Sequence, residues 1–158
     1  MSDIEIYIRP LIEKDAYTSF KWRNKSKIWK LTGSSPNIKI TPNIEFDWIR
    51  KVLNKKDEMR FAICIKEKNE YIGNVQLTKI KNYKAEFHIF IGEEKYWNKG
   101  IGSIATLLLI DYVKKNMNLN QIYLYVDKEN IAAYKVYKKC GFSTVKKNKD
   151  FFMVYNIK

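Results

Sequence analysis

One stretch constrains this chain more than any other: a glycine-bearing loop that leads directly into an apolar helix. It reads Tyr96-Trp97-Asn98-Lys99-Gly100-Ile101-Gly102-Ser103, and an apolar run from 104 to 110 follows it. The first N–H groups of a helix have no partner within it and lie at the positive end of its dipole, so they favour phosphate. The two glycines allow a close approach of backbone to ligand, and Lys99 adds a positive charge. A plainer explanation exists, because many such glycine pairs form only a turn before a helix.

A second motif supports the phosphate interpretation. Residues 130–142 read Asn-Ile-Ala-Ala-Tyr-Lys-Val-Tyr-Lys-Lys-Cys-Gly-Phe. Together the two motifs resemble the GNAT superfamily of acyl-CoA-dependent N-acetyltransferases, whose phosphate loop is usually (Arg/Gln)-x-x-Gly-x-(Gly/Ala) and whose second half carries Asn-x-x-Ala-x-x-x-Tyr-x-Lys-x-Gly-Phe. Trp97 replaces the usual Arg or Gln, as in the branch similar to ribosomal-protein N-terminal acetyltransferases, and Asn98 stands where that branch has its first Gly. The matching positions are Gly100, Gly102, Asn130, Ala133, Tyr137, Lys139, Gly141 and Phe142.

The resemblance implies a fold, a cosubstrate and a cofactor site. The fold would be a single α/β GNAT domain over residues 1–158, with a mixed, mostly antiparallel twisted sheet and helices on both faces. Acetyl-CoA would be the cosubstrate, without a metal, and pantetheine would lie along the strand that ends at residue 91. The implied cofactor-binding residues are Phe90, Ile91, Trp97, Asn98, Lys99, Gly100, Ile101, Gly102, Ser103, Asn130, Ala133 and Lys139.

Hydrophobic periodicity predicts the same class of fold without the resemblance. Strand-like segments alternate with helical ones, and short connections among the central strands favour an antiparallel meander. Thr41-Pro42 is typical of an N-cap followed by proline in the first helical position. The expected strands are residues 4–9, 61–65, 71–77, 85–91, 121–126, 142–147 and 151–157, and the expected helices are residues 13–22, 25–31, 42–53, 102–116 and 130–139.

Bulk properties limit the class of protein. A chain of 158 residues with 46% apolar residues is expected to fold as one domain with its own core. It shows no segment long enough to cross a bilayer and no signal peptide, which predicts a cytoplasmic protein without a membrane partner. Cys64 and Cys140 have neither metal-ligand nor redox spacing, so we expect both to be reduced core residues.

The net charge of +13 is the one unusual bulk number. The lysines are spread along the chain with no block of like charge and no recognition motif, so we expect no nucleic-acid partner. An AT-rich genome would also produce frequent Lys, Asn and Ile. An anionic small ligand, such as CoA and the acceptor, is the functional alternative.

Tyr137 is the candidate general acid. The family places a tyrosine hydroxyl of this motif at the thioester sulfur, and a phenol with a reference pKa of about 10 stays protonated at neutral pH. A helix tyrosine is also a common core residue, as we expect for Tyr134 one turn away. Asn130 has two compatible roles, as an N-cap and as a contact to pantetheine.

The general base is less defined. Glu86 and His88 lie two apart on an expected strand, so they share one face, and His88 is the only histidine. Either could accept the amine proton, but ordered water performs this task in many family members, and a strand histidine can be structural.

The acceptor side is carried by the N-terminal half. Trp22 and Arg23, within Phe-Lys-Trp-Arg-Asn, resemble a segment of bacterial amino-sugar-nucleotide N-acetyltransferases, and residues 149–155 are similar too. Arg23 could bind a phosphate through two hydrogen bonds or pair with a nearby carboxylate. These features and the charge predict a small-molecule amine carried on an anionic or nucleotide-bearing molecule, not a polycation. Alternatives are a protein N-terminus or a non-catalytic CoA-binding module, in a monomer or homodimer.

Overall fold

Seven strands join in one sheet, in the spatial order β1-β2-β3-β4-β5-β7-β6. The computed structural model describes residues 3–32 and 35–158. All neighbouring strands are antiparallel except β4 and β5, which are parallel. The elements are β1 (Ile6–Pro10), η1 (Glu13–Asp15), α1 (Ala16–Arg23), α2 (Ser26–Thr32), α3 (Pro42–Leu53), β2 (Met59–Ile65), β3 (Glu70–Lys81), β4 (Lys84–Ile91), η2 (Glu94–Tyr96), α4 (Ile101–Asn116), β5 (Gln121–Asp127), α5 (Ile131–Lys139), β6 (Ser143–Lys147) and β7 (Asp150–Asn156). The predicted α/β class with a mostly antiparallel sheet is confirmed.

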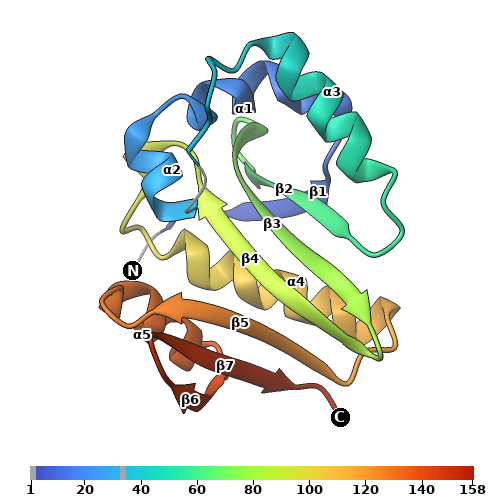
Figure 1. Ribbon diagram of the computed structural model, residues 1–158, viewed down its shortest axis with the longest axis vertical. Helices are drawn as coiled ribbons and strands as arrows, with labels where there is room; N and C mark the ends of the chain where they lie inside the picture. The colour runs from blue at the N-terminus through green and yellow to red at the C-terminus, as the bar shows by residue number, and fades with distance from the viewer. Residues whose placement is uncertain (1–2, 33–34) are drawn as a thin grey trace.

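Helices cover the two faces of the sheet unequally. Alternate residues of β2 point to opposite faces of the sheet. Phe61 and Ile63 belong to the core on the face covered by α4. Ala62 and Cys64 belong to the core on the face covered by α1, α2 and α3. Figure 1 shows α1–α3 grouped over one end of the sheet, and no helix of the described residues crosses in front of β5 and β7. That part of the front face is therefore open to solvent or to a ligand.

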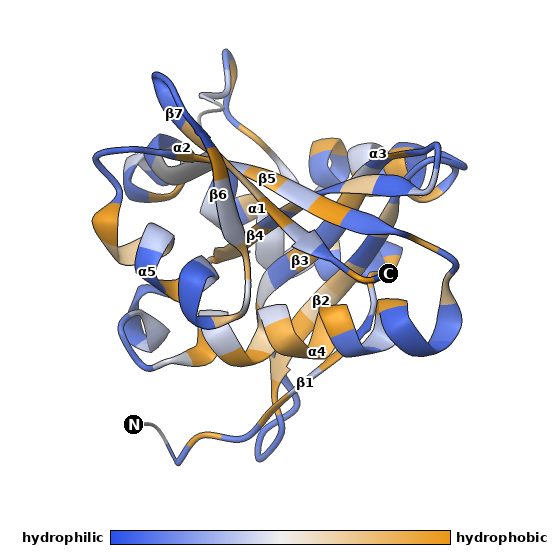
Figure 2. Cartoon of the chain, turned by 90° about the horizontal axis from the view of Figure 1, so that it is seen from below, coloured by the Kyte–Doolittle hydropathy of each residue, from blue (hydrophilic) through white to orange (hydrophobic). Residues whose placement is uncertain are grey.

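Helix α4 packs on the sheet through one side only. Its residues Ala105, Leu109 and Val113 are buried in the larger core, as the 3.6-residue period requires. Figure 2 shows α4 below β3, β4 and β5 and hydrophobic over much of its length. Ile104 and Leu107 belong to the apolar run noted in the sequence, but they lie exposed on the far side of the helix.

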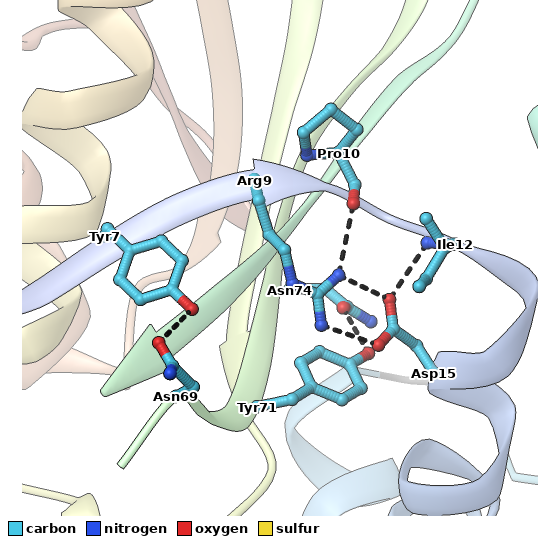
Figure 3. Close-up of polar contacts among 8 residues, drawn as sticks. All are labelled: Tyr7, Arg9, Pro10, Ile12, Asp15, Asn69, Tyr71 and Asn74. Atoms are coloured by element: carbon cyan, nitrogen blue, oxygen red, sulfur yellow. Dashed lines mark hydrogen bonds and ion pairs between the residues drawn. The ribbon is translucent and has the colours of Figure 1, made fainter. Parts of the chain in front are cut away.

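A half-buried ion pair ties the first strand to the first helical turn (Figure 3). Both oxygens of the Asp15 carboxylate accept from the Arg9 guanidinium, at 2.9 and 2.8 Å, and one also accepts from the Ile12 N–H at 2.9 Å. Bidentate geometry of this kind satisfies a carboxylate that is otherwise costly to bury. The Arg9 guanidinium also lies over the Tyr71 ring, which anchors the pair to β3.

The chain entering α3 follows the sequence prediction. Thr41 is the N-cap, its hydroxyl accepts from the Ile44 N–H at 3.2 Å, and Pro42 takes the first helical position. Glu45 lies in the first turn of α3, where it is 2% exposed and pairs with Arg23.

Strand β4 has different partners along its two edges. It pairs with β3 up to Ile91, opposite Gly73, but with β5 only through residues 84–86, opposite 121–123. Figure 1 shows β4 and β5 close together at their start and spreading apart toward their tips. The backbone of residues 87–91 therefore has a free edge facing the gap between the strands.

Gly92 is required where β4 ends, because Trp22 packs directly on it. A Cβ at this position would collide with the indole ring of Trp22, which is wholly buried. We predict that Gly92→Ala lowers the free energy of unfolding by about 1–3 kcal/mol, the range for overpacking a well-filled core. Denaturant unfolding measures it, and Gly102→Ala is the matched control because a Cβ there meets no neighbour within 4 Å. Equal stability of the two variants would contradict this packing.

Candidate active site

The loop before α4 presents a row of free backbone donors. Among the described residues, no N–H group of 98–103 donates to another protein group, and the first bond of the helix runs from Ile104 N to Gly100 O at 3.4 Å. Asn98 and Gly100 have positive φ values of 59° and 80°. Asparagine is the residue other than glycine that most readily adopts this conformation, which explains why Asn98 can replace the glycine expected there.

Space for a ligand is left open beside these donors. Neither glycine of the loop would bring a Cβ within 4 Å of another atom, and Lys99 is exposed. Ile101 differs from its neighbours because its side chain is 1% exposed and packs in the core. Only its backbone N–H is available to a ligand.

Trp97 fixes the loop to the end of β4. Its indole N–H donates to the Ile91 carbonyl at 2.9 Å, and its ring packs against the core under α1–α3. Trp97 therefore positions the loop, and it offers no charge to a phosphate in place of the usual Arg or Gln.

Tyr137 lies beside the point where the strands separate. Its ring is 6.0 Å from Phe87, the first residue of β4 beyond the β5 pairing, and 5.9 Å from Phe142. Burial raises the pKa of Tyr137 to about 12, so the hydroxyl stays protonated through the neutral range. It makes no hydrogen bond with any described residue, which leaves it free for a ligand. Tyr134 differs, because its hydroxyl is bonded to Thr144 at 2.9 Å.

The rest of the second motif lies around α5. Asn130 is the N-cap of this helix, and its side chain accepts from the Ala133 N–H at 3.2 Å. At the other end, the Cys140 thiol lies 3.6 Å from the Ser103 carbonyl in the first turn of α4, and Lys139 is exposed. Cys64 and Cys140 are both buried free thiols, as predicted.

Glu86 and His88 are brought together as their spacing predicted. They lie on the front face of β4, with His88 Nε2 3.3 Å from Glu86 Oε2 and 3.2 Å from the Thr78 hydroxyl. Lys79 pairs with the other oxygen of Glu86 at 3.2 Å. Burial lowers the pKa of His88 below its ordinary 6.5, although the carboxylate of Glu86 acts in the opposite direction. His88 is therefore neutral at pH 7 and able to accept a proton.

Strand register adds polar residues that sequence reasoning missed. Arg60 on β2, Gln76 on β3 and His88 on β4 lie side by side across three strands, and we call these three the polar row. The Gln76 Oε1 atom is buried without a partner among the described residues, and Arg60 pairs with Glu58 at 2.7 Å. The alternation Asn74-x-Gln76-x-Thr78 along β3 was the available signal, because a buried face that is polar at every second residue is unusual.

The structure places Trp22 and Arg23 differently from the predicted acceptor contacts. Trp22 is 0% exposed, and its indole N–H donates to Glu93 at 2.6 Å, so the ring has no surface for a substrate. Arg23 pairs with the buried Glu45 at 2.7 Å and stacks over Trp48. Of the two roles considered for Arg23, pairing with a nearby carboxylate is the one observed. Trp22 and Arg23 thus both hold α1 in place.

Comparison with known proteins decides the family. Residues 5–143 match the family model described as the acetyltransferase (GNAT) domain. The chain belongs to this family.

Individual relatives include several acetyltransferases. The chain is 38% identical over 98 residues to a spermidine N(1)-acetyltransferase of Escherichia coli, covering 61% of this chain and 52% of that protein. It is 26% identical over 137 residues to the acetyltransferase PseH of Campylobacter jejuni, covering 85% and 81% of the two chains. The matched stretch thus spans about half the length of the Escherichia coli relative.

Solved structures show the same fold. The spermidine N-acetyltransferase of Vibrio cholerae, in complex with CoA and spermine, has a TM-score of 0.81 at 24% identity and covers 96% of this chain and 95% of its own. In the described part of this chain, no helix is long and apolar enough to cross a membrane, and no group of three or more His, Cys, Asp or Glu residues could hold a metal.

We predict that Gly102→Val weakens CoA binding tenfold or more, roughly 1.4 kcal/mol, because the new side chain would occupy the space beside the free N–H groups. Isothermal titration with CoA measures the effect. Gly102→Ala is the smaller matched change and should lose less affinity. Unaltered CoA affinity in a folded Gly102→Val protein would remove the phosphate role of this loop.

Proposed function

We propose that this protein is an acetyl-CoA-dependent N-acetyltransferase that acts on the primary amine of a small molecule. The observation that carries the proposal is the free edge of β4, which runs from the split beside Tyr137 to the donor loop at residues 98–103. An extended pantetheine arm can pair with such an edge as an added strand does. The pyrophosphate would then reach the start of α4, where the N–H groups are unpaired.

The transfer would be a direct attack in a complex of both substrates. The amine nitrogen bonds to the thioester carbonyl carbon, and the C–S bond then breaks from the tetrahedral intermediate. Tyr137 would give its proton to the departing sulfur. His88, positioned by Glu86 and Thr78, would take the proton from the attacking amine, directly or through water.

The named relatives support a small amine as the acceptor. Named relatives include spermidine acetyltransferases and an aminoglycoside acetyltransferase structure, which shares the fold at 18% identity and a TM-score of 0.78. All of these names concern acetylation of small amines, which supports the same general class here. The sequence-based expectation of an anionic amine acceptor is a separate, finer proposal.

Thiol release from acetyl-CoA tests the function. The panel should contain spermidine, an aminoglycoside, an amino-sugar nucleotide and a peptide N-terminus, with Gly102→Val as the protein control. Release that depends on one small amine supports the proposal. Tight CoA binding with no release for any amine would favour the non-catalytic CoA-binding alternative.

For Tyr137→Phe we expect near-normal CoA binding and a fall in kcat of about 10²-fold, the low end for a positioned proton transfer. The ring, and with it the contacts to Phe87 and Phe142, is kept in this variant. Tyr134→Phe is the matched control and should keep full turnover. An unchanged kcat in Tyr137→Phe, or a loss confined to KM, would make Tyr137 a packing residue.

The pH profile of kcat/KM tests His88. Protonated His88 cannot accept a proton, so activity should fall as pH drops through a pKa below 6.5. His88→Gln should lose this limb, whereas the limb from ionisation of the acceptor amine is common to both proteins. The pKa of Tyr137 near 12 places its own ionisation above the usual assay range. If the two proteins lose activity at the same acidic pH, His88 is not the general base, and another group or water takes the proton from the amine.

A further inference from the structure

An aromatic platform borders the proposed site on the open part of the sheet. Tyr123 and Tyr125 on β5 and Phe152 on β7 lie with their ring centroids 5.0–6.2 Å apart. They point away from the core, because the alternate residues Leu124 and Met153 are buried under the helices. Tyr125 is 57% exposed, which is unusual for a large aromatic ring beside two others.

The platform is continuous with the catalytic groups. Tyr123 is the register partner of Glu86, at the last β4–β5 pair before the strands separate. Glu86 in turn contacts His88. A molecule whose amine reaches His88 can therefore extend over Tyr123 toward Tyr125.

A lysine-lined hollow lies on the other side of Tyr123. Its volume is about 530 Å³, and its lining includes Asp57, Lys79, Lys81, Asn82, Lys84 and Tyr123. Lys79 is already paired with Glu86. Lys81 and Lys84 form no ion pair with any described carboxylate.

The positions of Lys81 and Lys84 favour the binding of an anion between them. Lys81 and Lys84 are direct register partners across the β3–β4 hairpin. Like charges directly opposite each other destabilise a strand pair, and an anion bound between them would reverse the sign of that interaction. Asp57 is the one acid in the lining, and three lysines outnumber it.

We propose that the hollow and the platform form a subsite for the non-reacting part of the acceptor: a phosphate group held by Lys81 and Lys84, and a planar ring stacked on Tyr125. This inference rests on the proposed function and specifies its substrate class as an amine carried on a nucleotide-type group. Base stacking on exposed aromatic rings is sequence-tolerant and favourable, so it suits a substrate anchor. A linear polyamine carries neither an anion nor a ring.

The test is a titration of uridine 5′-diphosphate into the protein saturated with CoA, because free nucleotide could otherwise occupy the CoA site. We expect binding, about tenfold or more weaker in the double variant Lys81→Gln, Lys84→Gln, since hydrogen bonds to charged groups contribute that much. Tyr125→Ala should weaken binding by about five- to tenfold through lost stacking. The double variant Lys51→Gln, Lys115→Gln removes the same charge from exposed positions on α3 and α4 and should bind as the wild type does.

Two outcomes would overturn the subsite: no binding of uridine 5′-diphosphate to the CoA-saturated protein, or equal losses in the two double variants, which would indicate only the general field of a basic protein. Spermidine turnover and CoA affinity, measured on the same proteins, report on the proposed function separately. If both persist while uridine 5′-diphosphate fails to bind, the subsite alone is wrong. If CoA does not bind, the proposed function fails independently.

Discussion

The separation of β4 from β5 after three residue pairs is the constraint on which the rest of the structure depends. Backbone N–H and C=O groups are rarely left without partners inside a protein, yet residues 87–91 of β4 pair with no strand on the side toward β5, where the Ile91 carbonyl accepts from the Trp97 indole instead. Phe87, Tyr137 and Phe142 meet where the strands part, with centroids 5.9–6.0 Å from one another. These rings fill the interior side of the split.

The split also joins the two halves of the proposed chemistry. The donor loop and Tyr137 lie on the side of α4 and α5, whereas Glu86, His88 and the polar row lie on the side of α1–α3. Only where the sheet is open can groups from both faces reach one reacting carbon. The buried Trp22 contributes at a distance, because it packs on Gly92 and bonds to Glu93, just before the loop that Trp97 ties back to β4.

Much of the fold followed from local signals in the sequence. The hydrophobic periods located every α-helix and strand of the described residues to within a few residues, apart from the C-terminal end of β3, whereas the short η2 was not predicted. Thr41-Pro42 marked the start of α3. The exception is physical: β3 continues to Lys81 beyond the predicted residue 77, through an irregular register with Lys79 at a φ of 50°. The phosphate-binding role of the Gly100 and Gly102 loop could be predicted from sequence because the loop leads into a helix. The first N–H groups of any helix are unpaired, whatever the surrounding fold.

Contacts between distant strands could not be predicted in the same way. Arg60, Gln76 and His88 form a row only through the register of three strands, and Phe152 reaches Tyr125 only because β7 lies beside β5. Trp22 and Arg23 were predicted at the acceptor because of a short resemblance, but burial and the pairing with Glu45 depend on where α1 packs. Local sequence contains no information about that packing partner.

Hydrogen exchange of backbone amides tests the central claim most directly. If the free edge of β4 and the loop before α4 hold the cofactor, adding CoA should slow exchange at amides within 87–91 that face away from β3, and at 98–103. Amides of β2, which pairs with β1 and β3 and with neither strand that borders the split, serve as the internal reference. Saturation with CoA that leaves exchange at both 87–91 and 98–103 unchanged would contradict the account.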